Sequence, residues 1–152
     1  MIIRLGVDDY FVKMARLVAQ RATCHRRAVG CVLVNGANHV IATGYNGVAR
    51  GQPHCIDTPC PGAHCASGTG LHLCQAIHAE QNALLQCGNI NDIHTAYVTA
   101  SPCVHCVRLL LNTSCHRIVF AEEYPHPESK LLWNEDGRMW VHHPDNYPRG
   151  GT

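Results

Sequence analysis

Two short motifs containing histidine and cysteine constrain what this chain can fold into more than any other feature of its sequence. The first is His78-Ala79-Glu80, and the second is Pro102-Cys103-Val104-His105-Cys106. Zinc favours imidazole nitrogen and thiolate sulfur, and a catalytic zinc keeps three protein ligands and one open position. His78, Cys103 and Cys106 could supply those three ligands. The sequence therefore predicts a fold that brings the two motifs together.

Each motif is predicted to open a helix. Cys103 and Cys106 lie three residues apart in an expected first turn, so their thiols point the same way. The partial positive charge at that helix N-terminus favours thiolate over thiol. Glu80 stands two residues after His78, where its carboxylate can reach a metal-bound water without binding the metal, and can carry the proton of that water.

Three other interpretations of these residues compete with a catalytic zinc. Glu80 could satisfy the helix dipole, as acidic residues in a first turn do. A closed structural zinc site would need a fourth permanent ligand and would leave Glu80 without a role. A redox-active pair of cysteines would leave His78 unexplained. We favour the catalytic zinc because it gives every one of these residues a role.

Composition limits the remaining classes of protein. The sequence has 152 residues, of which 46% are hydrophobic and 15% charged, and this predicts one packed domain over residues 1–152. A formal net charge of +1 argues against long nucleic acid as a partner. No apolar run approaches the roughly 20 residues of a membrane span. Ten cysteines without a secretory signal pattern favour thiolate–metal chemistry in the cytoplasm over disulfides.

Hydrophobic periodicity and turn residues predict alternating helices and strands. The first helix is expected to begin with Asp8 or Asp9 as its N-cap and to end near Thr23, and a helix from His78 is expected to close at Gly88. Asn35-Gly36 predicts a turn. The other expected elements are strands at 28–34, 40–45, 95–100, 117–121 and 138–142, and helices at 102–112 and 127–133. This order predicts an α/β fold of three layers, α/β/α, with a central mixed sheet of about five strands.

Residues 46–77 are rich in Gly, Pro, Cys and His and lack periodicity. We expect a long loop there, ordered by metal ligands. Residues 144–152 are expected to form a short C-terminal tail. Cys31, Cys87 and Cys115 stand in apolar surroundings and are predicted to be small buried hydrophobic side chains.

With these residues in view, the chain resembles the deoxycytidylate deaminases of the zinc-dependent cytidine/deoxycytidylate deaminase superfamily, and its two motifs match the zinc-deaminase signature. The resemblance runs from about Asp9 to about Pro127. It rests on four stretches: Ala28-Val29-Gly30, Gly44-Tyr45-Asn46-Gly47, His78-Ala79-Glu80-Gln81-Asn82-Ala83 and Tyr97-Val98-Thr99-Ala100-Ser101-Pro102-Cys103.

The resemblance implies a cytidine-deaminase-like fold and the hydrolysis of deoxycytidylate (dCMP) to dUMP and ammonia, with Glu80 as the proton shuttle. It further implies substrate contacts from Asn46, Ala79, Ser101 and Tyr124. Asn46 could instead be a turn residue beside Gly47. Two alternatives stay open: a deaminase of dCTP, free (deoxy)cytidine or adenosine in RNA, and a zinc-stapled binding module without turnover.

The resemblance also implies a second, structural zinc. Matching positions are Cys24 and Cys55, with Cys60 and His72 as further ligands in one branch of the family. Cys65 and Cys74 are chemically equal candidates. Another branch uses a glutamate at the position that Ala76 occupies here, so that ligand set cannot be copied directly.

Regulation is expected on the same ground. Members of the family are often hexamers that dCTP activates and dTTP inhibits, with Mg²⁺ accompanying the triphosphate. Arg26 and Arg27, in the basic cluster after the first helix, are the residues that could bind those phosphates. A solvated helix end is the alternative role for this cluster.

Overall fold

The fold is a five-stranded mixed sheet between two layers of helices. In this computed structural model, residues 2–24, 27–66, 70 and 75–147 are described. The strands are β1 (Gly30–Val34), β2 (Val40–Tyr45), β3 (Thr95–Ala100), β4 (Arg117–Glu122) and β5 (Met139–His142). Their order in the sheet is β2-β1-β3-β4-β5. β1 runs antiparallel to both β2 and β3, whereas β3, β4 and β5 are mutually parallel.

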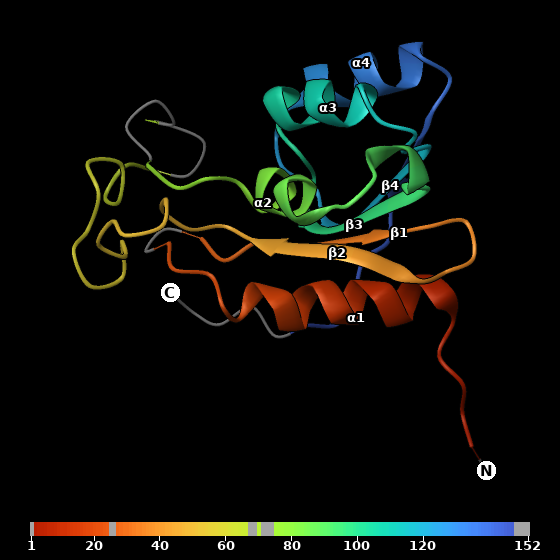
Figure 1. Cartoon of the computed structure of the whole chain (residues 1–152), viewed down its shortest axis with the longest axis horizontal. Coiled ribbons are helices and arrows are strands. Elements are labelled where there is room, and N and C mark those ends of the chain that lie inside the picture. The colour runs from red at the N-terminus through yellow and green to blue at the C-terminus, as the bar shows by residue number, and fades with distance from the viewer. Residues whose placement is uncertain (1, 25–26, 67–69, 71–74, 148–152) are drawn as a thin grey trace.

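Helices cover both faces of this sheet, as Figure 1 shows. One face carries α1 (Val7–Ala19), and the opposite face carries α2 (Ala79–Gln86), α3 (Val104–Leu111) and α4 (Pro127–Glu135). The predicted three-layer α/β/α fold with a mixed sheet of five strands is thereby confirmed. None of the helices in the described residues is long and apolar enough to cross a membrane.

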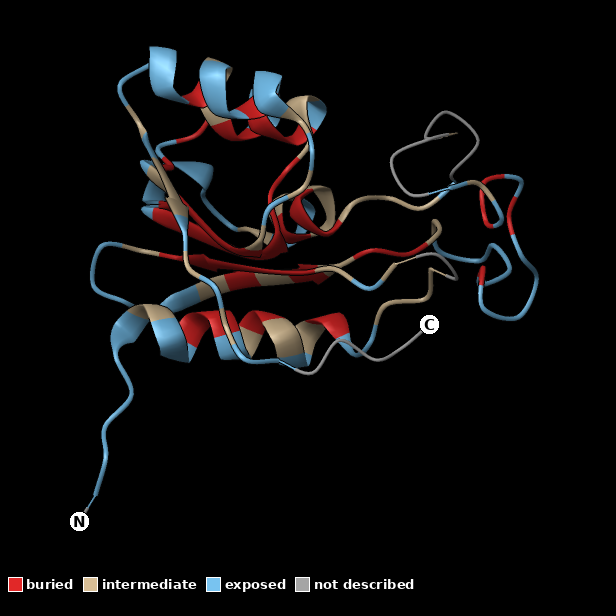
Figure 2. Cartoon of the chain, turned by 180° about the vertical axis from the view of Figure 1, so that it is seen from behind, coloured by how far each residue is buried: buried red, intermediate tan, exposed pale blue. Residues whose placement is uncertain are grey.

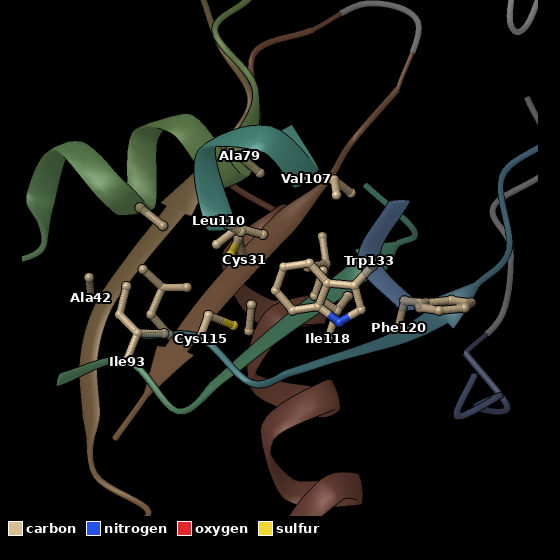
Figure 3. Close-up of a cluster of buried hydrophobic side chains, with 14 residues drawn as sticks. Cys31, Ala42, Ala79, Ile93, Val107, Leu110, Cys115, Ile118, Phe120 and Trp133 are labelled. Carbon is tan, nitrogen blue, oxygen red and sulfur yellow. The ribbon is translucent and has the colours of Figure 1, made fainter. Parts of the chain in front are cut away.

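The hydrophobic core lies on the two faces of the sheet, where the central strands β1, β3 and β4 are buried (Figure 2). On the side of α2, α3 and α4, Trp133 packs with Ile118 and Phe120 of β4 (Figure 3). On the side of α1, Phe11 packs against Tyr97 of β3 with ring centroids 5.1 Å apart. Burial of these aromatic and branched side chains stabilises the layers.

Two glycines let helices approach the sheet closely. A Cβ at Gly30 of β1 would overlap the backbone of α1 at Ala15, and a Cβ at Gly44 of β2 would overlap the backbone of α2 at Ala79 and Ala83. Because no side chain intervenes, the first turn of α2 rests directly on β2. This contact fixes the position of the residues at the start of α2.

Most element bounds agree with the sequence to within about two residues, and the largest difference lies at a helix end. The strand expected from residue 28 begins at Gly30, and β4 and β5 differ from expectation by one residue at one end. β2 and β3 begin and end as predicted. The N-cap of α1 is Gly6, not Asp8 or Asp9, and this helix ends at Ala19, not near Thr23. The Asp8 carboxylate instead accepts a hydrogen bond from the Tyr97 hydroxyl at 2.7 Å. Asp8 therefore binds a residue of β3 and does not cap the helix.

The expected glycine closure of α2 is also wrong. Cys87 follows the helix in an extended conformation (φ −74°, ψ 127°), and Gly88 is absent from the positive-φ residues of the described chain. Cys31 and Cys115 are fully buried, as predicted. Cys87 is only half-buried, and its thiol donates a hydrogen bond to the Asn89 carbonyl at 3.4 Å.

Candidate metal centre and pocket

The N-termini of α2 and α3 converge, and two cap residues together with one residue of α3 form a candidate metal-binding cluster. His78 is the N-cap of α2, Cys103 is the N-cap of α3, and Cys106 lies three residues further on. The His78 Nδ1 atom is 3.5 Å from the Cys103 Sγ atom and 3.3 Å from the Cys106 Sγ atom. Pro102 precedes the cap rather than lying in the first turn, which corrects the expected start of this helix. The two predicted motifs therefore meet in space.

These three side chains have the dimensions of a zinc site. In a tetrahedral zinc site with ordinary Zn–N and Zn–S bonds, nitrogen and sulfur ligands are about 3.6 Å apart, close to the separations seen here. All three ligand atoms lie within 4.8 Å of one another. Within the described ranges no other group of three histidine, cysteine or acidic side chains meets this condition. The donor set of one imidazole and two thiols therefore fits zinc.

The electrostatics of the cluster favour thiolate at one ligand. Hydrogen bonds from Cys106 and His78 lower the pKa of the Cys103 thiol to about 3, against the opposing effect of burial. The hydrogen bond to Cys103 and burial raise the pKa of Cys106. The hydrogen bond with Cys103 also raises the pKa of His78. Zinc binds the deprotonated forms of these side chains, so metal binding competes with protons at His78 and Cys106.

Glu80 lies beside the cluster and is 4% exposed. It occupies the first turn of α2, and its carboxyl group is hydrogen-bonded to Cys106. Burial is the main cause that raises the pKa of Glu80, and the hydrogen bond and the charge of His78 oppose it. A buried carboxyl group with a raised pKa is suited to accept and return a proton near neutral pH.

A pocket of about 200 Å³ opens over the cluster. His78, Cys103 and Glu80 line it. The four residues implied as substrate contacts also line this pocket: Asn46, Ala79, Ser101 and Tyr124. The arrangement thus places a proton carrier and a metal-binding cluster on the wall of a cavity that a small ring can enter.

Asn46 binds backbone on the pocket wall. Its Oδ1 atom accepts a hydrogen bond from the Val29 N–H at 2.8 Å, and its Nδ2 atom donates to the Arg27 carbonyl at 2.7 Å. The buried amide therefore ties the segment before β1 to the end of β2. Neither hydrogen bond is one that a simple turn residue beside Gly47 would make.

Ser101 connects two loops of the pocket. Its hydroxyl oxygen accepts a hydrogen bond from the Tyr124 N–H at 2.6 Å. This contact holds the loop after β4, so that Tyr124 and His126 line the same pocket as the cluster. Nothing in the sequence singles out His126 except its place two residues after Tyr124.

Arg27 also lines the pocket, its guanidinium carbon 3.7 Å from the centre of the Tyr124 ring. The resemblance implies only a contact with a regulatory triphosphate for this residue. Arg26, the other residue in that expectation, lies outside the described residues.

The cysteine-rich loop holds a second pair of thiols. The Sγ atoms of Cys55 and Cys60 are 3.6 Å apart and both residues are buried. Cys24 and Cys65 line the pocket described above. His72 and Cys74 lie outside the described residues.

Comparison with known proteins yields a family and several relatives. The family description "Cytidine and deoxycytidylate deaminase zinc-binding region" matches residues 6–122. The deoxycytidylate deaminase of Saccharomyces cerevisiae is 38% identical over 137 residues, which span 88% of this chain and 44% of that protein. The deoxycytidylate deaminase of Mycobacterium phage D29 is 39% identical over 123 residues, which span 76% of this chain and 94% of that protein.

A solved structure has the same fold. The dCMP deaminase of cyanophage S-TIM5, crystallised in complex with dCMP and dUMP, superposes with a TM-score of 0.72 at 22% sequence identity, covering 93% of this chain and 100% of that chain. The cytidine-deaminase-like architecture expected from the sequence is thereby confirmed.

Proposed function

The chain belongs to the family of cytidine and deoxycytidylate deaminases with a zinc-binding region, and on that premise we propose that it hydrolyses dCMP to dUMP and ammonia. One observation carries the proposal: the cluster of His78, Cys103 and Cys106 shares a pocket with the buried carboxyl group of Glu80. Two relatives that carry the name deoxycytidylate deaminase support the choice of substrate.

In this proposal His78, Cys103 and Cys106 hold zinc. When bound there, zinc makes a water molecule acidic enough to act as a nucleophile near neutral pH. Glu80 would accept a proton from that water and deliver it to N3 of the cytosine ring while the remaining hydroxide adds to C4. Glu80 would then take the proton of the new C4 hydroxyl group and pass it to the amino group, which leaves as ammonia as the C4–N bond breaks and the C4 carbonyl forms. The raised pKa that burial gives Glu80 helps it to hold the proton between these transfers.

A substrate panel tests the proposal. The full chain, loaded with zinc, is given dCMP, dCTP, deoxycytidine and cytidine in turn, and ammonia release is measured. The proposal expects the highest kcat/KM for dCMP. A higher kcat/KM for dCTP or for a free nucleoside would contradict dCMP as the substrate and favour that alternative. Failure to release ammonia from any of the four compounds would favour a binding module without turnover.

We also propose a second zinc, at Cys24, Cys55, Cys60 and His72. The short distance between the thiols of Cys55 and Cys60 supports it. So does the hydrogen bond from the Ile56 N–H to the Thr23 carbonyl at 3.1 Å, because it brings the backbone of the loop beside the segment that contains Cys24.

Protein purified without chelator is expected to contain a second equivalent of zinc, which Cys55→Ala removes. The melting temperature of this variant should also fall, because structural zinc contributes to folding. Cys87→Ala is the matched control and should keep both metals. A single zinc in the unmodified chain would contradict the second site.

Finally, we propose that the chain forms a hexamer whose activity responds to dCTP and dTTP with Mg²⁺. The resemblance to deoxycytidylate deaminases supports this regulation. A sigmoidal rate curve against dCMP is expected, which dCTP shifts to lower and dTTP to higher substrate concentration, with couplings typically about 5–150-fold. Rate curves with and without each triphosphate test it, together with the mass of the assembly in solution. Hyperbolic curves that neither triphosphate moves would contradict regulation.

A further inference from the structure

The segment that follows β5, residues 143–147, lies across α1 and is fastened to it (Figure 2). We call this segment the C-terminal strap. The Arg16 guanidinium of α1 donates two hydrogen bonds of 2.9 Å to the two carboxylate oxygens of Asp145, the paired geometry in which arginine binds a carboxylate most firmly. The same guanidinium lies 4.7 Å from the centre of the Tyr147 ring. Arg16 therefore attaches the strap to the helix.

Arg16 also binds the end of β4. Its Nη2 atom donates a hydrogen bond to a carboxylate oxygen of Glu122 at 3.2 Å. The side chains of Arg16 and Asp145 are only 11% and 12% exposed, and that of Glu122 is 28% exposed. Solvent screens such pairs less than it screens ion pairs on an open surface. One guanidinium thus connects α1, the strap and the last residue of β4.

Glu122 stands where β4 leads into the wall of the pocket. Its backbone carbonyl accepts a hydrogen bond from the Ser101 N–H at 2.9 Å. Two residues later, the Tyr124 N–H donates to the Ser101 hydroxyl at 2.6 Å. The loop 123–126 begins directly after Glu122, and Tyr124 and His126 of this loop line the pocket. The position of Glu122 therefore sets where the loop begins and where its side chains enter the pocket.

We propose that Arg16 is a positioning residue which, together with Asp145 of the strap, holds Glu122 and thereby fixes the loop 123–126 against the pocket. The inference rests on the proposed function and deepens it. In the described chain Arg16 does not belong to the residues that line the pocket, so it acts through Glu122. The metal-binding cluster and Glu80 lie at the starts of α2 and α3, on the opposite face of the sheet from α1. Loss of Arg16 should therefore impair substrate binding more than zinc binding or proton transfer.

A second arginine supplies a matched control. Arg117, the first residue of β4, forms an ion pair of 3.1 Å with Asp8 of α1, and the two side chains are 22% and 29% exposed. This pair joins the same helix to the same strand as Arg16 and Glu122 do. It lies at the start of β4, however, whereas the loop of the pocket follows the end of β4. Arg117→Met should therefore destabilise the fold without disturbing the loop.

Hydrogen–deuterium exchange of the Tyr124 amide, followed by NMR, tests the role of Arg16 without requiring turnover. In the zinc-loaded full chain, Arg16→Met should speed this exchange by about 10-fold or more, the range for loss of a hydrogen bond to a charged group. Asp145→Ala should speed it in the same direction, because it removes the strap from Arg16 without altering α1 or β4. Arg117→Met should leave it within about twofold, because separate regions open independently.

Binding of dUMP, the product of the proposed reaction, provides a second measurement. In calorimetric titrations Arg16→Met should weaken dUMP binding by about three- to tenfold and leave the zinc content unchanged, and the KM for dCMP should rise by a similar factor while kcat changes less than about twofold. Arg117→Met should keep the dUMP affinity and KM of the unmodified chain. Melting temperatures of both variants separate this effect from a general loss of stability, which would alter the two variants alike.

An unchanged Tyr124 amide in Arg16→Met would overturn the proposal, as would equal acceleration in Arg117→Met. Faster exchange with unaltered dUMP affinity would contradict the link between the loop and the substrate. An effect of Arg16→Met that Asp145→Ala does not share would exclude the strap. A chain that binds no dUMP and releases no ammonia from dCMP would refute the proposed function, whereas the exchange rates would still decide whether Arg16 holds the loop.

Discussion

Glu80→Gln is expected to keep the fold and the zinc and to lower kcat for dCMP by about 10²–10⁴-fold, the usual contribution of a positioned proton carrier. The amide of glutamine has nearly the shape of the carboxyl group but cannot take a proton from water and return it to the base. Glu80 is 4% exposed, so water cannot easily replace it as the carrier. Metal analysis measures the retained zinc, and steady-state kinetics with dCMP measure the fall in kcat.

Glu135→Gln is the matched control, because it makes the same chemical change at an exposed position at the end of α4. It should leave kcat unaltered. Near-normal turnover in Glu80→Gln would remove Glu80 from the mechanism. Loss of zinc together with activity would mean that its carboxyl group supports the metal and not the proton transfer.

Cys103→Ser is expected to remove both the catalytic zinc and the activity. Cys103 provides one of three ligands, and its pKa of about 3 makes it a thiolate ready to bind the metal. A serine hydroxyl offers no such anion at neutral pH. Removal of a ligand should weaken zinc binding by more than about 100-fold, because the loss of groups that only support a ligand already costs 10- to 100-fold.

Cys87→Ser is the control for this substitution. Its thiol is half-buried and donates to the Asn89 carbonyl, a hydrogen bond that a hydroxyl can also make. Zinc content and ammonia release should both match those of the unmodified chain. Cys103→Ser protein that retains a full equivalent of zinc at the catalytic cluster and full activity would rule out the assigned ligand set.

The sequence predicts the sheet well because strands and their alternation follow from short apolar runs between turn residues. β2 and β3 have the bounds expected of them. Helix ends are less predictable, because capping groups can be diverted to tertiary partners. The Asp8 carboxylate binds Tyr97, and the α2 helix ends at an extended Cys87 before Gly88 can act as its cap.

The metal-binding cluster was predictable for a different reason. Its residues stand at fixed spacing within two motifs, and each motif begins a helix, so local geometry carries most of the information. The pocket wall lacks this advantage. Arg27 and Tyr124 lie far apart in the sequence, and only the folding of the loop after β4 against Ser101 brings them into contact. No hydrophobic periodicity or motif spacing in the sequence indicates that these two side chains are in contact.

Deamination of dCMP in water enriched in ¹⁸O tests the central claim most directly. The zinc-loaded chain is incubated with dCMP, and the product is analysed by mass spectrometry alongside an assay for ammonia. Hydrolysis assisted by Glu80 predicts one equivalent of ammonia for each dUMP formed, with one ¹⁸O atom at C4 of the ring. Absence of dUMP, or dUMP whose C4 oxygen does not come from water, would contradict it.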